Sequence, residues 1–370
     1  MADFDAVVIG AGAVGLACAA RLARGGRAVL VLEAAMRPGE GISSRNSEVI
    51  HAGLYYQTGS LKHRLCVTGR RLLYDYLSER GIAHRRCGKI VVATSAEELA
   101  GIEALKARGE ANGVEGLRWL TAGQIAEMEP EIACQGGLLS PETGIFDSHQ
   151  YLLALSAEIE SAAGHVALGS PFLAAEPVGN GFEIQTGGEE PTRFWAPCLV
   201  NSAGLSAPRV AGAIAGLADN DIPRYRLAKG NYFRFTGRSS FSRLVYPAPV
   251  DGGLGVHATL DMAGNLRFGP DVEWQSPGLE ADSIDYGVDP TRAPGFATAI
   301  RRYWPGLPER ALVPDYAGLR PKLSGPGDPP ADFDIRGGEL SGLVNLYGIE
   351  SPGLTASLAI ADHVVRLLEI

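Results

Sequence analysis

A glycine-rich turn close to the start of the chain has the spacing of a dinucleotide-binding motif. A short β-branched run at 5–9 leads directly into three glycines in the pattern G-x-G-x-x-G, namely Gly10, Gly12 and Gly15. The first glycine permits a tight turn, the second lets the backbone approach a pyrophosphate, and the third lets strand and helix pack closely. The amides of Ala13 and Val14, in the first turn of the expected helix, would then receive the phosphates.

An acidic residue follows at the distance that such a motif needs. The apolar run 28–32 predicts a second buried strand, which ends at Glu33, 23 positions after Gly10. A carboxylate about 20 positions after the motif accepts hydrogen bonds from ribose hydroxyls. A coincidental glycine turn is the alternative, but it would not explain strand, motif, helix, strand and acid in this order. Because the motif lies at the N-terminus and no second one follows for a nicotinamide cofactor, the sequence favours FAD over NAD.

The segment 41–56 combines hydroxyls, an amide, a histidine and two tyrosines without clear periodicity. A chain that lies along a flat polar ring system would have this composition. The residues expected to contact the cofactor are Ser43, Ser44, Asn46, Ser47, His51, Ala52, Gly53 and Leu54. Taken alone, His51 would more often be a structural histidine whose hydrogen bonds are satisfied.

A second helix start, near the C-terminus, could bind an anion. Ser351 is a suitable N-cap, and Pro352 fits the first helical position, where its missing N–H costs nothing. The amides of Gly353, Leu354 and Thr355 could then point at the negative charge of a reduced flavin ring. An ordinary capped helix is the alternative interpretation.

Four side chains in the second half of the chain could contact a substrate: Lys229, Tyr246, His257 and Arg320. An arginine at a flavin could hold a planar carboxylate bidentately, although Arg320 taken alone would more often form a surface ion pair. His257, in an expected strand at 254–259, could hold the substrate or take its hydroxyl proton; a core histidine is the alternative. Lys229 and Tyr246, on neighbouring expected strands, are weaker candidates.

Hydrophobic periodicity predicts the elements that position these residues. Helices are expected over 13–24, 68–80, 96–111, 148–163 (capped by Asp147) and 352–368. Strands are expected at 166–168, 172–175, 182–185 and 198–201, and the last runs into the small residues Ser202, Ala203 and Gly204, which would return the chain beside the nucleotide. Short strands at 227–235, 243–246, 253–259 and 265–268, joined by 89–93, predict an antiparallel sheet.

Composition narrows the class of protein. The 370 residues include 48 glycines and 23 prolines without a G-x-y period, so the chain is neither collagen-like nor disordered. A net charge of −9 (33 basic minus 42 acidic residues) argues against nucleic acid as a partner. Five scattered cysteines indicate neither a disulfide framework nor a metal site and suggest a cytoplasmic location. The N-terminal apolar run lacks the positive segment of a signal peptide and is too short to span a membrane; peripheral membrane contact stays open.

The segment around His51 resembles the FAD-dependent D-amino-acid oxidase/glycine oxidase superfamily, and most closely its L-2-hydroxyglutarate dehydrogenase branch. That branch has the pattern N-S-x-V-I-H-x-G-(I/L)-Y-Y, matched by Asn46, Ser47, Val49, Ile50, His51, Gly53, Leu54, Tyr55 and Tyr56. Further matches are Ser60-Leu61-Lys62, Leu65-Cys66-Val67, Cys87-Gly88-Lys89, Thr143-Gly144-Ile145 with Asp147, Ala203-Gly204-Leu205, Gly255-Val256-His257 and Gly269-Pro270. Pro321-Lys322 departs from the branch.

The resemblance implies an α/β plus antiparallel β fold, with a Rossmann-like FAD-binding domain interleaved with a smaller α+β substrate domain. The expected FAD-binding domain covers 1–88, 146–220 and 315–370, and the expected substrate domain covers 89–145 and 221–314. The resemblance also implies that Phe172 offers backbone hydrogen bonds to adenine. Leu319 and Arg320 would lie at the flavin, with Arg320 holding the carboxylate of a small-molecule substrate.

The resulting hypothesis is an FAD-dependent oxidation of a 2-hydroxy acid to a 2-oxo acid. Arg320 would orient the carboxylate, His51 or His257 would take the hydroxyl proton, and the hydride would pass to flavin N5. The electron acceptor could be oxygen, a quinone or a carrier protein. An amino-acid or amine oxidase on the same scaffold is the nearer alternative, and a non-catalytic dinucleotide-binding sensor is the more distant one.

Overall fold

The computed structural model describes residues 3–249, 255–279 and 283–369. Within these residues, the first sheet has six strands in the order β20 (Asp334–Gly337), β21 (Leu343–Tyr347), β13 (Cys198–Asn201), β1 (Ala6–Ile9), β2 (Val29–Leu32) and β9 (His165–Ala167). The pair β20–β21 is antiparallel and the other pairs are parallel. The four central strands are buried along their whole length, which explains their continuous apolar runs.

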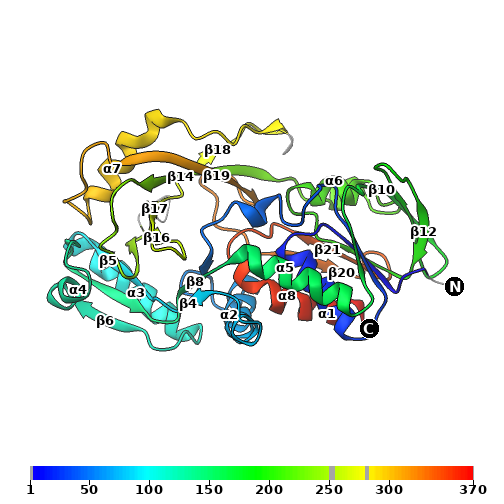
Figure 1. Cartoon of the computed structure of the whole chain (residues 1–370), viewed down its shortest axis with the longest axis horizontal. Coiled ribbons are helices and arrows are strands. Elements are labelled where there is room, and N and C mark those ends of the chain that lie inside the picture. Colours follow the sequence, from blue (N-terminus) through cyan, green and yellow to red (C-terminus); the bar gives the residue numbers. More distant parts are fainter. Residues whose placement is uncertain (1–2, 250–254, 280–282, 370) are drawn as a thin grey trace.

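Helices pack closely against this sheet because small residues line their contacts. Figure 1 shows three of them side by side: α1 (Ala13–Arg24), α5 (Ser148–Ser161) and α8 (Gly353–Leu368). The helix α2 (Leu61–Glu79) lies against α8, where a Cβ on Gly69 would come within 2.6 Å of the Thr355 carbonyl oxygen. Asp147 Oδ1 accepts a hydrogen bond from the Gln150 amide at 2.9 Å, so the predicted cap of α5 is confirmed.

The second sheet has nine strands among the described residues. Their order is β18 (Glu273–Trp274), β14 (Arg226–Phe235), β17 (Leu266–Phe268), β16 (Ala258–Leu260), β15 (Leu244–Pro247), β5 (Lys89–Ala93), β7 (Gly136–Ser140) and β6 (Arg118–Thr121), with β19 (Leu312–Lys322) paired to β14. Most pairs are antiparallel and β5 joins the sheet, as predicted, although β5 runs parallel to β15. Accompanying helices are α3 (Ala96–Ala111), α4 (Ala122–Met128) and α7 (Ala293–Arg301).

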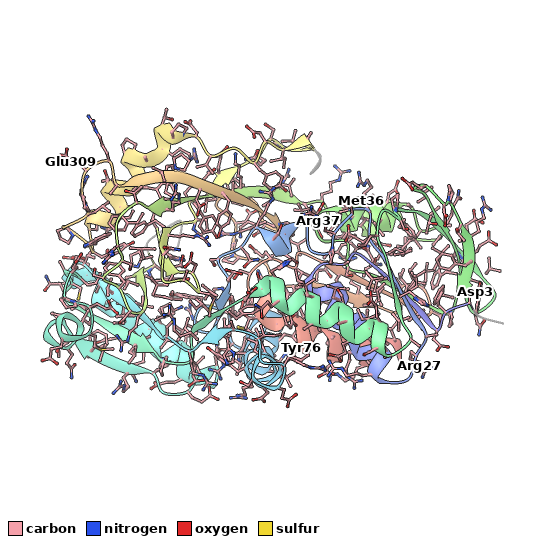
Figure 2. All side chains as sticks on the ribbon, in the orientation of Figure 1. Asp3, Arg27, Met36, Arg37, Tyr76 and Glu309 are labelled. Atoms are coloured by element: carbon pink, nitrogen blue, oxygen red, sulfur yellow. The ribbon has the colours of Figure 1, made fainter. Side chains whose placement is uncertain are left out.

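Two small sheets complete the described chain. One contains β10 (Phe172–Val178), β11 (Gly181–Thr186) and β12 (Arg193–Ala196), followed by α6 (Ala207–Gly212); the other contains β3 (Val49–Ile50), β8 (Gly144–Phe146) and β4 (His84–Arg85). The first lies in the same half of the molecule as both chain ends (Figure 1). Figure 2 shows Asp3 at that end of the long axis and Glu309 at the opposite end, within the second-sheet half.

Three differences between the predicted and the observed elements involve residues of the cavity described below. The helix predicted at 68–80 begins at Leu61, because Ser60 caps it by accepting from the His63 amide. The strand predicted at 253–259 is shorter: 253 and 254 lie outside the described residues, and β16 begins at Ala258. The left-handed backbone of Gly255, with φ +70°, interrupts the extended chain before it. The segment 312–322, for which no strand was predicted, is the eleven-residue strand β19.

No helix in the described part of the chain is long and apolar enough to cross a membrane. All five cysteines are free thiols. The division into two interleaved domains stays a prediction, and its boundary at 315 falls inside β19, which connects the second sheet to β20 and β21 of the first.

Candidate active site

A cavity of about 2420 Å³ extends from the glycine turn after β1 to the second sheet. Its wall contains parts of 41–58, 202–206, 318–332 and 349–355, together with Glu33, Phe172, Tyr246 and His257. Segments that are far apart in the sequence therefore meet around one space, and each segment of chemical interest in the sequence contributes to it.

The glycine turn has the close contacts that its spacing predicts. Gly10 has φ +99°, and a Cβ there would lie 2.8 Å from the Ser202 carbonyl oxygen. A Cβ on Gly15 would lie 2.0 Å from the Gly10 carbonyl oxygen and 2.6 Å from Ser202 Oγ. Ser202 donates through its amide and its hydroxyl to the Ile9 carbonyl, at 3.0 and 2.8 Å. A side chain at either glycine would push the turn away from the chain that follows β13.

Polar groups surround this turn. The Ala13 amide donates to Ser43 Oγ at 2.9 Å. The Glu33 carboxylate accepts from the Ala11 amide at 2.7 Å and from the Ala35 amide at 2.9 Å, which holds it in the cavity wall at the end of β2. A carboxylate oxygen can accept more than one hydrogen bond, so both oxygens remain able to receive ribose hydroxyls.

Hydrogen bonds made by side chains of the segment 41–56 fix the path of its backbone. Asn46 Nδ2 donates to the Ser43 carbonyl at 2.7 Å, and Asn46 Oδ1 accepts from the Glu48 amide at 2.7 Å. Glu48 has a left-handed backbone, with φ +56°, and its carboxylate accepts from the amide and hydroxyl of Ser148 at 3.1 and 2.8 Å. These bonds hold the segment along the cavity.

His51 connects this segment to the start of α8. Its amide donates to Thr355 Oγ1 at 3.0 Å, and its Nε2 lies 3.1 Å from Ser351 Oγ. Desolvation, followed by the positive charges of Lys89 and Arg320, lowers the pKa of His51 to about 3. The imidazole is therefore neutral near pH 7; the same low pKa makes it a weak base in the empty cavity, and an anionic substrate that offsets the two cations would raise its basicity.

The helix α8 begins one residue later than the sequence pattern indicates. Pro352 is its N-cap and Gly353 its first residue, whereas the pattern favours Ser351 as the cap and Pro352 inside the helix. The physical reason is that the Ser351 hydroxyl bonds to His51 and forms no cap hydrogen bond with the helix.

The first turn of α8 presents two amides to the cavity, one fewer than predicted. The Gly353 amide donates to the Glu350 carbonyl at 2.6 Å and is not available to an anion. The amides of Leu354 and Thr355 have no acceptor among the described residues, and both residues line the cavity.

Glu350, next to this helix, lies between two lysines that the sequence analysis did not select. Its carboxylate is 3.0 Å from Lys62 Nζ and 3.1 Å from Lys322 Nζ. Desolvation raises the pKa of the Glu350 carboxyl. The positive charges of these lysines and of Arg320 outweigh it and keep the pKa below its ordinary value. Lys322, where the sequence departs from the hydroxyglutarate dehydrogenase branch, therefore belongs to a cluster with excess positive charge beside α8.

Arg320 lies on β19 opposite Ala228 of β14 and lines the cavity. No acid among the described residues forms an ion pair with it, so the surface ion pair considered above is not seen. Burial raises the pKa of Tyr232, and Arg320 beside it opposes that rise. Tyr232 also lines the cavity, and a lone tyrosine in a predicted strand gave no signal of this role.

The other substrate candidates divide into two groups. Tyr246 and His257 both line the cavity and stack, with ring centroids 3.5 Å apart and planes 9° apart. Lys229 does not line it, because its ammonium donates to the Gly287 carbonyl at 2.6 Å.

Five residues predicted to bind the cofactor lie outside the cavity wall: Gly15, Ser44, Ala52, Gly53 and Leu54. Ala52 and Leu54 are buried in the core beside the second sheet. Gly53, with φ +110°, turns the chain against Val67, and the Ser44 hydroxyl donates to carbonyls of its own turn. These residues support the wall rather than form it.

The remaining predicted residues fit an FAD molecule. Gly12 and Val14 line the cavity at the glycine turn, where a Cβ on Gly12 would meet Ser43 Oγ at 3.2 Å, and Glu33 and Phe172 line the adjoining part. At the far end, the two open amides of α8 suit the partial negative charge of a flavin ring. The Ala13 amide, which was predicted to receive a phosphate, donates to Ser43 Oγ, whereas the Val14 amide has no acceptor among the described residues. The cavity therefore offers the Val14 amide for a pyrophosphate, an acceptor for a ribose and a positive helix end for a flavin.

This geometry agrees with the comparisons with known proteins. The family model described as FAD dependent oxidoreductase matches residues 5–367, so the chain belongs to that family. The predictions of an FAD-dependent oxidoreductase and of FAD as the cofactor are thereby confirmed. Among curated relatives, the mitochondrial L-2-hydroxyglutarate dehydrogenase of Arabidopsis thaliana is 43% identical over 98% of this chain and 83% of its own length. The L-2-hydroxyglutarate dehydrogenase of Escherichia coli K12 is 28% identical over 99% of this chain and 93% of its own length.

Solved structures show the same fold. An L-α-glycerophosphate oxidase from Mycoplasma pneumoniae with FAD bound has a TM-score of 0.88 at 23% identity, covering 99% of this chain and 95% of its own. A glycine oxidase from Geobacillus kaustophilus has a TM-score of 0.82 at 22% identity, covering 99% and 94%. The predicted fold class is confirmed.

Proposed function

We propose that the protein oxidises L-2-hydroxyglutarate, or a closely similar 2-hydroxy acid, to the 2-oxo acid. One observation carries the proposal: a neutral histidine and an arginine without a carboxylate partner line the same cavity, beside the open amides of α8. The relatives named as L-2-hydroxyglutarate dehydrogenases support oxidation of a 2-hydroxy acid.

Arg320 would bind the carboxylate next to the reacting carbon. Its guanidinium has parallel N–H groups that match a carboxylate, and Glu350, the acid whose pKa it affects, is already paired with Lys62 and Lys322. A substrate carboxylate would therefore complete the ion pair that Arg320 lacks within the chain.

His51 would take the hydroxyl proton. Its lowered pKa keeps it neutral, and the Ser351 hydroxyl, 3.1 Å from Nε2, orients the ring, while the bond from the His51 backbone amide to Thr355 Oγ1 fixes the chain at this point. Bound FAD would supply the two-electron acceptor for the hydrogen that leaves the carbon. His257 is the second candidate for the base, supported by its place in the cavity wall.

An anaerobic screen of the purified holoenzyme tests this proposal. L-2-hydroxyglutarate should bleach the flavin absorbance near 450 nm, whereas its D-enantiomer and amino acids should leave it unchanged. Bleaching by amino acids alone would favour an amino-acid oxidase, the alternative that the glycine oxidase fold raises. A protein that purifies without flavin and binds none would favour the non-catalytic sensor.

The final electron acceptor, which could be oxygen, a quinone or a carrier protein, and the cytoplasmic location stay predictions. Oxygen consumption during turnover, measured against reduction of a soluble quinone, separates the first two acceptors.

A further inference from the structure

Lys89 is a buried lysine with no acidic counter-ion in the described structure, and desolvation lowers its pKa to about 7. It is the first residue of β5 and is 1% exposed. Its ammonium lies 4.6 Å from the ring centroid of Tyr55 and 4.6 Å from that of Tyr246. No carboxylate among the described residues forms an ion pair with it or contributes to its titration.

A cysteine thiolate does not supply the missing negative charge. Cys66 is the group whose ionisation would most favour the charged form of Lys89, but burial raises the pKa of the Cys66 thiol to about 12. The thiol is therefore neutral near pH 7. Attraction to two aromatic rings stabilises the ammonium, but a buried cation without a counter-ion remains unfavourable. Such a site gains stability when an anion binds nearby.

Lys89 does not itself line the cavity but lies directly behind its wall. Tyr55 and Tyr246 both line the cavity, and His257 stacks on one face of the Tyr246 ring, which leaves the ammonium the opposite face. The charge of Lys89 acts on His51 more strongly than that of Arg320 does. Two cations from different strands, β5 and β19, therefore face the same histidine.

We propose that Lys89 recognises the second carboxylate of a dicarboxylate substrate. The inference rests on the proposed function: Arg320 holds the carboxylate beside the reacting carbon, and the far carboxylate lies at the wall formed by Tyr55 and Tyr246. Because this wall is poorly solvated, a carboxylate there favours the ammonium form of Lys89 and is attracted to it more strongly than it would be in water. Lys89 is thus a specificity-determining residue, and it selects dicarboxylic over monocarboxylic 2-hydroxy acids.

The test compares two substrates that differ in one group. L-2-hydroxyglutarate and L-2-hydroxyvalerate have five carbons each, but only the first has a second carboxylate. In Lys89→Met, which keeps the volume and removes the charge, KM for hydroxyglutarate should rise roughly 100-fold and KM for hydroxyvalerate should change less than about 3-fold. Lys89→Arg should retain a large part of the discrimination. Lys106→Met, on an exposed pair with Glu110, is the matched control.

A measurement on the wild-type holoenzyme keeps the test decisive if Lys89→Met fails to fold. Glutarate should compete with the substrate far more strongly than pentanoate does. Equal inhibition by both, or an equal rise of both KM values in Lys89→Met, would overturn the role of Lys89 while leaving the proposed function intact. If neither hydroxy acid bleaches the wild-type flavin, the proposed function fails, and the inference fails with it.

Discussion

The two ends of the cavity are built in different ways. At the nucleotide end, the contacts come mainly from the backbone. A Cβ added to Gly10 or Gly15 would lie 2.0 to 2.8 Å from carbonyl and hydroxyl oxygens, so neither position has room for a side chain. The first turn of α1 presents its amides beside them. At the substrate end, the proposed contacts are side chains on separate strands: Arg320 on β19 and Tyr246 on β15 line the cavity, and Lys89 on β5 lies behind its wall.

The difference indicates how each end can change. A backbone cradle accepts any dinucleotide of the right shape and tolerates no added atoms. A wall of side chains can alter its substrate by single substitutions while the fold remains. We therefore expect substitutions at the nucleotide end to remove the cofactor, and substitutions at the substrate end to alter kinetics with the flavin retained.

The largest effect is expected from Gly15→Ala. The new methyl group would lie 2.0 Å from the Gly10 carbonyl oxygen and separate α1 from the turn. The purified variant should lose nearly all flavin absorbance relative to protein absorbance at 280 nm. Gly101→Ala, in α3 with no atom within 4 Å of the added Cβ, is the control and should keep its flavin. A fully loaded Gly15→Ala protein would contradict the backbone account of this end.

His51→Gln should have the next largest effect. The amide cannot take the hydroxyl proton, so the rate of anaerobic flavin reduction should fall about 10²- to 10⁴-fold, with bound flavin unchanged. His149→Gln, on the exposed face of α5, should behave as the wild type. An unaffected rate in His51→Gln would transfer the role of base to His257.

Arg320→Met should raise KM roughly 100-fold, since a charge-assisted pair with the substrate carboxylate is lost. The absorbance spectrum of the bound flavin, recorded alongside the steady-state kinetics, should stay unchanged. Arg302→Met removes an exposed arginine paired with Glu98 and is the matched control. If Arg320→Met instead lost its flavin at unchanged KM, Arg320 would belong to the cofactor site.

Ser351→Ala should have a smaller effect, about 10-fold on the rate of flavin reduction. It removes the hydroxyl 3.1 Å from His51 Nε2 and leaves the start of α8 unchanged, because Ser351 does not cap that helix. Ser351→Thr should restore most of the rate. A fall in thermal stability without a change in rate would indicate a purely structural hydrogen bond.

The smallest effect is the expected absence of an acid limb from His51 in the pH profile. Desolvation and two neighbouring cations disfavour imidazolium, so the pKa of His51 falls from 6.5 to about 3. His51 therefore stays in its neutral, proton-accepting form as the pH decreases from 7.5 to 5. The kcat/KM for flavin reduction should show no acid limb near pH 6.5 in rapid-mixing measurements. A limb at that pH would mean that His51 is solvated in the holoenzyme.

The same contrast explains what the sequence could predict. Gly10, Glu33 and the order of the elements around them could be predicted, because the motif lies within about 25 residues and its strand, glycine turn, helix, strand and acid follow a fixed order. Tyr232 and the Lys62–Glu350–Lys322 cluster were not identified as site residues, because only the folded chain brings them to the cavity, and Lys89 was missed because folding places it behind the wall formed by Tyr55 and Tyr246. The start of α8 was predicted one residue early, since the bond that occupies Ser351 comes from His51, 300 residues away.

An anaerobic titration of the wild-type holoenzyme with L-2-hydroxyglutarate asks whether this acid reduces the bound flavin. The account predicts that one equivalent bleaches one equivalent of flavin and yields one equivalent of 2-oxoglutarate, quantified by mass spectrometry. Bleaching without 2-oxoglutarate, or no bleaching by this acid while an amino acid reduces the flavin, would contradict it.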